Sequence, residues 1–384
     1  MSKPTIQDIF LRFYPRYLEK YAPSPQQAKV AHYIINCKTG AYGANVSMCE
    51  DCGHLQIHYN SCRNRCCPMC QALPKEKWMD NRREDVLDAP YFHVVFTVPH
   101  ELNPLIFSNQ QLLYDALYHS VSSTINELTE DTKHLGAKVG YICVLHTWGS
   151  EMNYHPHIHV ILLGGGLTAK NQWKDKGEEF FLPVKVLSKL FRGKYMDELK
   201  TLWEDNKLEF HGTSEKYRNH FTFKELLDTC YNKEWIPHCK KTFNGAQSVI
   251  NYLGKYTHRI AISNHRIICM DKTTVTYYVK DYREEGNWKE LTISGIEFIR
   301  RFLMHVLPSG FQKIRYYGFL NNRTKTKNLK IIFRLQGYQK FKQRYVGLSI
   351  AELLREVWNY DIHVCPACGC SSMTHLGRSY AYRS

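Results

Sequence analysis

The fold of this chain is decided by a short run of histidines and aliphatic residues, His155-Pro156-His157-Ile158-His159-Val160-Ile161-Leu162-Leu163, which Gly164-Gly165-Gly166 follows. An unbroken apolar block predicts a buried strand, and the glycines predict the turn that ends it. Side chains two residues apart on a strand point to the same face, so His157 and His159 project together. Two imidazoles held on one rigid face form half of a divalent-metal site. Histidines that only make hydrogen bonds on a sheet surface are the alternative.

The segments around this strand favour an α+β fold with an antiparallel sheet. Residues 91–99 and 141–148 are rich in β-branched and aromatic side chains and are expected to be strands. Residues 112–128, between them, have helical spacing. Strand, helix, strand, short loop and strand in this order is typical of an antiparallel sheet with helices rather than of a doubly wound sheet.

Further elements are expected on both sides of this core. Residues 167–244, rich in lysine and glutamate, are interpreted as an insertion with one helix over 184–203. The other expected elements are helices over 6–14, 26–35 and 294–307 and a strand over 275–279.

Composition narrows the class of protein. The chain has 384 residues, enough for two or three domains, and a formal net charge of +15. It also carries 26 tyrosines, 18 phenylalanines and 7 tryptophans. Basic charge with interleaved aromatics suits a polyanion whose bases can stack, which favours single-stranded nucleic acid. A basic globular protein without such a ligand is the alternative.

The sequence also bears on the compartment. It contains no run of 18 apolar residues, and no apolar segment follows Met1-Ser2-Lys3-Pro4. We therefore expect no membrane span, no signal peptide and a cytoplasmic protein. Fourteen cysteines in a reducing compartment favour metal ligation over disulfides.

Two C-x2-C pairs, Cys49–Cys52 and Cys67–Cys70, predict a structural zinc site. Each pair brings two thiolates to one ion, so the four cysteines are expected to share a tetrahedral Zn²⁺. Further cysteines leave room for a second ion. These are Cys37, Cys62 and Cys66, with His54 nearby, and the tail segment from Cys365 to Cys370, an incomplete knuckle with His375 beyond it.

Basic residues in two stretches are candidate DNA contacts. Arg63 and Arg65 lie between the two cysteine pairs, where they could meet phosphates. Residues 309–335 are also basic and include Lys313 and Arg315. A solvated basic face is the alternative interpretation of this second stretch.

Two tyrosines in a helical stretch are the second candidate for chemistry. Tyr252 and Tyr256 lie four residues apart within 245–259, which places them one turn apart on one helix face. Lys255 lies beside them, and Arg259, which follows, is a further candidate DNA contact. Tyrosines at this spacing usually pack in a core. In a basic chain that also has a two-histidine strand, catalysis becomes a stronger interpretation.

These residues carry a resemblance to a known family. His157-Ile158-His159 resembles the His-hydrophobe-His motif of the HUH endonucleases, and Tyr252-Leu253-Gly254-Lys255-Tyr256 is similar to the nucleophile helix of their two-tyrosine branch. Three further segments narrow the resemblance to bacterial rolling-circle insertion-sequence transposases with an N-terminal zinc-binding domain. They are Cys49-Glu50-Asp51-Cys52-Gly53, the run from Tyr59 to Gln71, and His305-Val306-Leu307-Pro308-Ser309-Gly310-Phe311.

The resemblance implies a chemistry in which a tyrosine hydroxyl attacks a DNA phosphate. Tyr252 is the expected first nucleophile, Tyr256 would cut a second strand, and Lys255 would offset charge at the phosphate. The substrates would be the single-stranded transposon ends and the target DNA. Cleavage would leave a 5′-phosphotyrosine on the protein and a free 3′-OH on the DNA. A catalytic Mg²⁺ or Mn²⁺ held by His157 and His159 would polarise the phosphate. A bacterial, nucleoid-associated protein is implied as well.

The third protein ligand of that ion is left open by the sequence. Two histidines alone leave the ion short of ligands. Glu151 lies just before the histidine strand and offers a hard oxygen that suits Mg²⁺ or Mn²⁺. His146 on the neighbouring strand is the competitor.

The resemblance extends from about Cys37 to Gly318, with one departure: Cys66 stands where the family commonly has a histidine. It implies three consecutive parts. Residues 1–88 would form a zinc-binding DNA-recognition domain and 89–300 the HUH nuclease domain with its insertion. Residues 301–384 would form a basic region with a cysteine-rich tail.

Two other functions are compatible with parts of the sequence. His155, His157 and His159 also resemble the motif of the histidine-triad nucleotide hydrolases, but this interpretation leaves the cysteines, the tyrosine pair and the basic charge unexplained. A non-catalytic, zinc-dependent DNA-binding protein with structural histidines is the other. Metal-dependent nicking of a single-stranded oligonucleotide separates all three.

Overall fold

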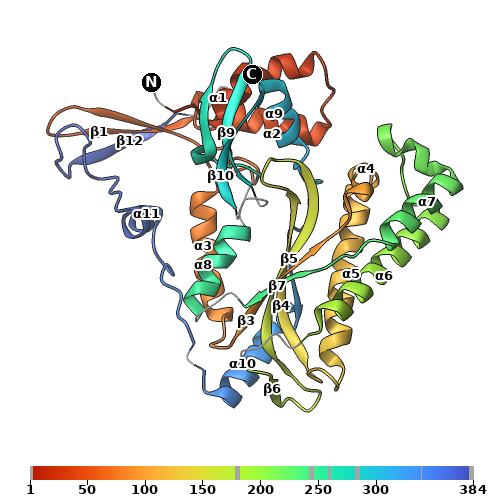
Figure 1. Ribbon diagram of the computed structural model, residues 1–384. Helices are drawn as coiled ribbons and strands as arrows, with labels where there is room; N and C mark the ends of the chain where they lie inside the picture. The colour runs from red at the N-terminus through yellow and green to blue at the C-terminus, as the bar shows by residue number, and fades with distance from the viewer. Residues whose placement is uncertain are drawn as a thin grey trace. The chain divides into compact units, whose positions relative to one another are not determined.

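The computed structural model describes residues 3–177, 182–241, 246–257, 261–281, 286–338 and 340–379, which form two compact units (Figure 1). The sheet unit comprises residues 82–261 and 307–341. The zinc unit comprises residues 1–81, 262–306 and 342–384. Each unit is assembled from segments far apart in the sequence, whereas the sequence suggested three consecutive domains.

The sheet unit is built on an antiparallel sheet with the strand order β11-β4-β5-β3-β7. The histidine strand β5 is central, with β3 on one side, β4 on the other and β6 paired to its end. An α+β fold with an antiparallel sheet was expected, and it is confirmed. The strands are β3 (Tyr91–Thr97), β4 (Lys138–Trp148), β5 (Tyr154–Leu167), β6 (Trp173–Asp175), β7 (His238–Lys241) and β11 (Ile314–Gly318).

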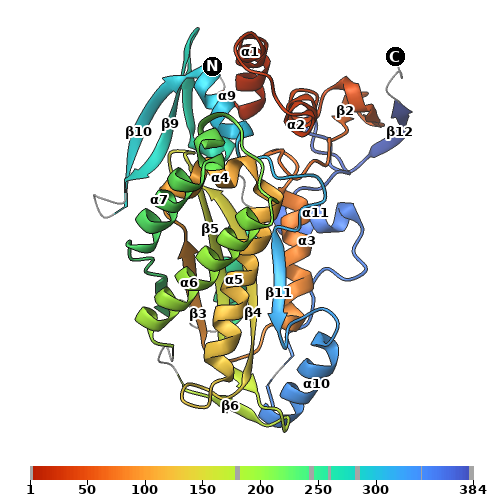
Figure 2. The same ribbon diagram turned by 90° about the vertical axis from the view of Figure 1, so that its right-hand side faces the viewer.

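Helices cover one face of this sheet. The helices α4 to α7 lie in front of the strands in Figure 2, and α8 lies on the other side of the sheet in Figure 1. Ile158, Val160 and Leu162 of β5 point into the covered face and share a core with Leu117 and Phe191. The histidines alternate with these residues, so they point to the opposite face. The covering helices are α4 (Asn103–Ser108), α5 (Gln110–Glu130), α6 (Val184–Glu204) and α7 (His220–Tyr231); α8 (Ala246–Thr257) and α10 (Lys325–Gln336) complete the unit.

The strand β5 runs past the glycines that were expected to end it. Gly165 and Gly166 remain in the strand and pair with β6. A Cβ atom on Gly166 would lie 2.6 Å from the carbonyl oxygen of Lys138, so glycine permits a close approach of β4. The expectation of a turn here was wrong because the glycines serve strand packing.

Residues 167–244, interpreted from the sequence as an insertion, contribute to the main core wherever this stretch is described. α6, the helix expected over 184–203, buries Phe191 and Tyr195 in the main core, and α7 adds Leu226. β7 then extends the sheet beside β3. Lysines and glutamates on the outer faces of these helices hid the apolar stripe beneath them.

The zinc unit contains two three-stranded sheets, ordered β12-β1-β2 and β10-β9-β8, and several helices. The aromatic rings of Phe10 and Phe302 pack edge to face at 5.2 Å and join α1 to α9. The capping residue Ser294 starts α9, which ends at Leu303 rather than at Leu307. The elements are α1 (Ile6–Leu18), α2 (Pro25–Ile35), β1 (Ala44–Cys49), β2 (Leu55–Tyr59), α3 (Ala72–Arg82), β8 (Ile267–Met270), β9 (Thr274–Asp281), β10 (Asn287–Ser294), α9 (Gly295–Leu303), α11 (Ile350–Trp358) and β12 (Met373–Ser379). Among the described residues of the whole chain, no helix combines the length and apolarity needed to cross a bilayer.

Candidate active site and metal clusters

Three histidines converge on the face of the sheet that α4 to α7 leave uncovered. The register of β4 and β5 sets His146 directly opposite His157. The ligand nitrogens of His146, His157 and His159 lie within 4.8 Å of one another, and all three side chains are buried. Nε2 of His157 is 3.0 Å from Nε2 of His159. Two nitrogens that bind one ion at ~2.1 Å and at right angles lie about 3 Å apart, so this spacing fits a shared metal ion.

Hydrogen bonds on the far side of two rings orient these imidazoles. Nδ1 of His157 lies 2.7 Å from the backbone carbonyl of His155 and donates to it, which leaves Nε2 as the ligand atom. Nδ1 of His159 lies 2.8 Å from Nε2 of His93 on β3. A metal-binding Nε2 of His159 requires the proton on Nδ1, which then donates to His93. Each of the two rings is therefore held with Nε2 directed at the other.

Burial favours the neutral form of His157 and of His93. The pKa of His157 is lowered to about 3, mainly by burial and to a smaller extent by nearby His155. Burial also lowers the pKa of His93 to about 4, with a smaller contribution from His238. Neutral imidazole is the form that binds a metal, so His157 needs to release no proton to bind one at neutral pH.

The donor set discriminates between metals. Mg²⁺ in proteins takes oxygen ligands, whereas imidazole binds transition metals. The histidine set therefore fits Mn²⁺ or a later transition metal better than Mg²⁺. Glu151, the expected oxygen ligand, is not among the described residues that converge here, and His146 takes that place.

Tyr252 on α8 contacts His93, which in turn contacts His159 of this cluster. Its ring is half-buried and meets the ring of His93 at 4.9 Å and 63°. The backbones of Lys255 and Tyr256 belong to the same helix, but their side chains lie outside the described structure. Arg259 lies outside the described residues altogether. The structure thus brings Tyr252 to the histidine site and leaves the roles of the other three as predictions.

The candidate DNA-binding residues differ in how far their charge is engaged. Arg63 and Arg65 are exposed in the zinc unit. The ammonium group of Lys313 lies 4.9 Å from the ring centroid of Trp148. Arg315 points to the helix-covered face, where it pairs with Asp115 and stacks on an aromatic ring of α5. The charge of Arg315 is therefore already engaged within the sheet unit, and its role as a phosphate ligand stays a prediction.

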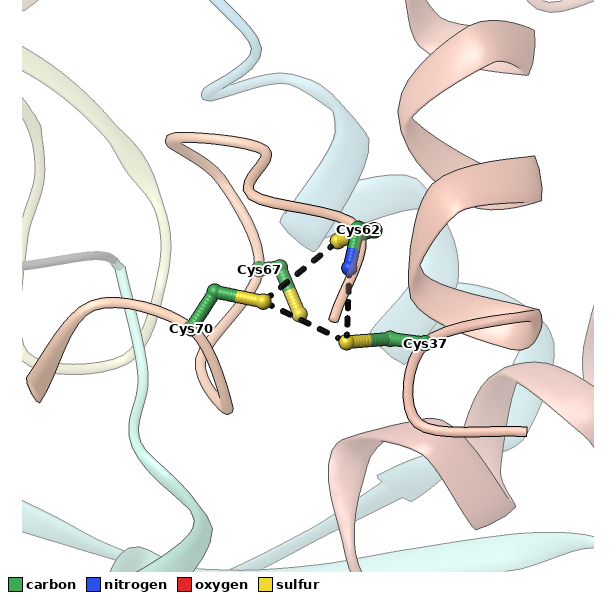
Figure 3. A group of neighbouring side chains, drawn as sticks. All are labelled: Cys37, Cys62, Cys67 and Cys70. Atoms are coloured by element: carbon green, nitrogen blue, oxygen red, sulfur yellow. Dashed lines mark hydrogen bonds between the residues drawn. The ribbon is translucent and has the colours of Figure 1, made fainter. Parts of the chain in front are cut away.

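Four cysteines of the zinc unit point toward one another (Figure 3). The thiols of Cys37, Cys62, Cys67 and Cys70 lie within 4.8 Å, with Cys37 Sγ 3.3 Å and Cys62 Sγ 3.6 Å from Cys70 Sγ. The thiol of Cys67 donates to that of Cys70, and this hydrogen bond is the main reason that the pKa of Cys70 is lowered to about 4. The cluster fits a structural Zn²⁺ with four thiolates.

The expected sharing of one ion by Cys49, Cys52, Cys67 and Cys70 was wrong. The structure divides them between two clusters, because Cys67 and Cys70 find their partners at positions 37 and 62. Cys49 and Cys52 instead meet two cysteines of the C-terminal tail. Spacing alone shows which cysteines form a pair, but the fold decides which pairs meet.

Comparison with known families places the chain among transposases by sequence. The family model described as a putative transposase matches residues 140–328. A second model, described as a transposase zinc-binding domain of IS91 type, matches residues 9–98. The two matches cover the sheet with its histidines and the first cysteine cluster.

Two curated relatives match nearly the whole chain. The putative transposase y4qJ of Sinorhizobium fredii is 38% identical over 380 residues, which cover 96% of this chain and 93% of that protein. The transposase for insertion sequence element IS801 of Pseudomonas savastanoi pv. phaseolicola is 27% identical over 347 residues, covering 88% and 80%.

Solved structures give more distant matches. The conjugative relaxase TrwC in complex with oriT DNA, in its metal-bound form, is 16% identical with a TM-score of 0.23, over 29% of this chain and 43% of that chain. Its copper-bound form is 14% identical with a TM-score of 0.26, over 52% and 69%.

Proposed function

This chain belongs to the IS91-type family of insertion-sequence transposases, and from that membership we propose that it nicks and rejoins single-stranded DNA through a phosphotyrosine. Of the two relatives named above, one is described as a transposase and the other as a putative transposase. The sheet unit contributes a tyrosine beside a three-histidine cluster, and the zinc unit contributes exposed arginines. These features support strand cleavage at the ends of a mobile element.

In the proposed step, the hydroxyl oxygen of Tyr252 attacks the phosphorus of a phosphodiester. A bond forms between that oxygen and phosphorus, and the bond from phosphorus to the 3′ oxygen breaks. The tyrosine proton leaves to solvent, and the 3′ oxygen takes up a proton. The 5′ fragment of the cut strand then ends in a free 3′-OH, and the 3′ fragment is joined to the protein through its 5′ phosphate. Attack by a 3′-OH on the phosphotyrosine reverses the step. No nucleotide cofactor is needed, because the phosphotyrosine ester retains the energy of the broken phosphodiester bond.

His146, His157 and His159 would hold the divalent ion of this reaction, with Mn²⁺ preferred over Mg²⁺ by the donor set. Such an ion, when bound, polarises the phosphate and stabilises negative charge on the leaving oxygen. The chain itself orients the ligands, since the His155 carbonyl holds His157 and the ring of His93 holds His159.

We assign the second cleavage to Tyr256. It follows Tyr252 by one turn of α8, so both can serve one active face. A second tyrosine allows a second strand to be cut before the first is released. Lys255, between them in the sequence, is proposed to offset charge at the phosphate.

The contact between Tyr252 and His93, the hydrogen-bond partner of His159, carries this proposal. The tyrosine ring packs on His93 at 4.9 Å, and Nε2 of His93 lies 2.8 Å from Nδ1 of His159. One residue therefore separates the proposed nucleophile from a proposed metal ligand. A metal site that needs a nearby nucleophile explains this arrangement better than core packing alone.

Trapping the covalent adduct tests the proposal. Single-stranded oligonucleotides that tile the DNA flanking the coding sequence are incubated with the protein and Mn²⁺, and adducts are mapped by peptide mass spectrometry. Wild-type protein should carry the 3′ fragment of the oligonucleotide on Tyr252. Tyr252→Phe keeps the ring and should lose this adduct, whereas the control Tyr278→Phe, on β9 of the zinc unit, should retain it. DNA on Tyr256 alone reverses the order of the two roles. DNA on any other residue overturns the mechanism.

A further inference from the structure

A second cysteine cluster joins the two ends of the chain. The thiols of Cys49 and Cys52 meet those of Cys365 and Cys368, and all four lie within 4.8 Å. Sγ of Cys49 is 3.6 Å from Sγ of Cys368, and Sγ of Cys52 is 3.7 Å from Sγ of Cys365. Sulfurs of a tetrahedral zinc site at a Zn–S distance of ~2.3 Å lie about 3.8 Å apart, whereas disulfide sulfurs are about 2.05 Å apart. The spacing fits an ion and not a disulfide.

The two halves of this cluster are the same turn built twice. In each half the sequence is C-x2-C-G, and the first cysteine is buried while the second is exposed. Each glycine adopts a left-handed conformation, with φ of 70° at Gly53 and 76° at Gly369. The backbone hydrogen bonds also match: Cys49 N to His54 O (3.0 Å) and Gly53 N to Cys49 O (2.9 Å), and Cys365 N to Cys370 O (2.8 Å) and Gly369 N to Cys365 O (2.9 Å). Two such knuckles face to face supply four thiolates to one tetrahedral ion.

Strand pairing brings the tail to this position. β12 pairs antiparallel with β1, with Cys49 opposite Met373. The amide of Glu50 donates to the carbonyl of Ser372 at 3.1 Å, and the hydroxyl of Ser372 lies 3.3 Å from the thiol of Cys49. The tail knuckle is thus held in register with the N-terminal knuckle and not merely near it.

Apolar burial alone does not explain why this sheet is stable. The buried residues at this cluster are Cys49, Cys365 and Met373, so two of the three are thiols. On β2, Leu55 and Ile57 are 57% and 52% exposed. A three-stranded sheet with so little buried surface needs another source of stability, which a structural metal supplies in small domains.

We propose that Cys49, Cys52, Cys365 and Cys368 bind a structural Zn²⁺ that fastens the C-terminal strand to the N-terminal zinc unit. Cys52 and Cys365 are 313 residues apart, so the ion closes a loop that includes the whole sheet unit. The match to the transposase zinc-binding domain ends at residue 98. Two of the four proposed ligands, Cys365 and Cys368, therefore come from outside the matched segment. This inference is independent of the proposed DNA chemistry.

Zinc content of the purified full-length protein tests the site. Wild-type protein should hold two zinc ions per chain, one for each cysteine cluster. Cys365→Ser with Cys368→Ser should hold one, and so should Cys49→Ser with Cys52→Ser. The variant with all four substitutions should also hold one, because both halves serve the same ion. Cys370→Ser, two residues from a ligand but outside the cluster, should keep two.

Loss of zinc through general misfolding is distinguished by a ligand-preserving variant. Cys368→His retains a zinc-binding side chain and should restore the second ion that Cys368→Ser loses. Two zinc ions in the Cys365→Ser, Cys368→Ser protein would overturn the proposal. A wild-type protein with one ion that is lost only on substitution of Cys62 or Cys67 would overturn it too.

Limited proteolysis gives a second, independent measurement. Substitution of Cys49 and Cys52, near the N-terminus, should expose the distant segment 359–379 to cleavage. Cys370→Ser should leave that segment as resistant as in the wild type. Unchanged resistance of the tail in the Cys49→Ser, Cys52→Ser variant would contradict the fastening role.

Discussion

The histidine cluster and the two cysteine clusters are built in opposite ways. The histidines stand on strands whose other face is covered by a large apolar core, so the sheet fixes the rings before a metal arrives. The cysteines stand on turns and short strands, and around the second cluster the buried residues number three. The first site is preorganised by packing, whereas the cysteine sites depend on the ion for their own structure.

Because of this difference, substitutions at the histidine site should affect activity, whereas substitutions at the cysteine sites should affect stability. Removing a histidine ligand should change chemistry while the sheet persists, because Ile158, Val160 and Leu162 still hold β5 in the core. Removing a cysteine ligand should instead unfold its surroundings. Substitutions of each kind therefore test whether the two kinds of metal site are as different as the packing indicates.

The largest effect is expected from His157→Ala. Loss of one of three ligands should lower strand cleavage by ~10²-fold or more, because the ion that stabilises the leaving oxygen is no longer held. DNA binding and the melting temperature should stay near the wild-type values. Cleavage assays with added Mn²⁺, electrophoretic mobility shifts and thermal melts check this.

The matched control for this variant is His155→Ala. It removes a neighbouring imidazole but keeps the backbone carbonyl that orients His157. Cleavage should survive this change. Full activity in His157→Ala would remove the histidine from the metal site.

The next largest effect is expected from Cys67→Ser in the first cysteine cluster. Loss of a thiolate should release one zinc ion and, with it, binding free energy of about 10 kcal/mol that stabilises this region. Hydrogen exchange should increase in residues 37–80 and stay low in β3, β4 and β5. DNA binding should weaken as well.

Cys66→Ser is the neighbouring control, since this thiol does not belong to the cluster. It should retain both zinc ions and wild-type exchange rates. If exchange rose equally in the sheet unit of Cys67→Ser, the division into metal-dependent and packing-dependent parts would be wrong.

The sequence predicted local features of both sites better than their partners. Period-two spacing identified His157 and His159, and helical spacing identified the helix of Tyr252. His146 and His93 enter the site through the strand register, at 11 and 64 residues from His157. The sequence offered His146 only as the competitor of Glu151, and His93 was not predicted, because no local pattern shows which residues of two strands lie opposite each other. A signal for His93 did exist, because it is a polar residue within an otherwise apolar strand.

The cysteine pairs illustrate the same limit. Each C-x2-C pair was recognised, but pairs close in sequence were assigned to one ion, whereas the fold matches Cys49 and Cys52 with a knuckle 313 residues away. The glycines after the histidine strand were misread for a related reason. Their role depends on how closely β4 and β6 approach β5. That approach cannot be predicted from the sequence of β5 alone.

A smaller effect is expected from changes at His93, and two variants separate its two contacts. His93→Phe keeps a ring against Tyr252 but removes the acceptor for His159, so Mn²⁺ affinity should fall by ~10- to 100-fold. Saturating metal should restore much of the cleavage. His93→Gln keeps an acceptor without the ring, so it should bind Mn²⁺ more tightly than the Phe variant. Titration of Mn²⁺ by calorimetry measures both, and equal affinities would show that the hydrogen bond does not orient His159.

The smallest effect is expected in the part of the zinc unit that packs without metal. Glu297 on α9 bonds Arg300 and Arg301 at 2.6 Å and 2.8 Å, and the hydrogen bond from Arg300 is the main reason that the pKa of Glu297 is lowered to about 2. A carboxyl whose folded-state pKa is depressed stabilises the fold above its ordinary pKa near 4.5, and this contribution is lost as the pH falls toward 2. Glu297→Gln should therefore lower the free energy of unfolding by about 1 kcal/mol at both pH 7 and pH 5. Zinc content should not change, because apolar contacts such as Phe10 with Phe302 hold this helix.

The control for this last change is Glu290→Gln, which alters the charge equally at an exposed position on β10. Denaturant unfolding of the two variants at both pH values compares the ion pairs with a simple change in net charge. A larger loss at pH 5 than at pH 7 would contradict the depressed pKa, since both values lie above the window in which Glu297 takes up its proton. Loss of zinc from Glu297→Gln would show instead that the helices and the cysteine clusters of this unit are not independent, and the contrast between packing-dependent and metal-dependent parts would then lie only between the two units.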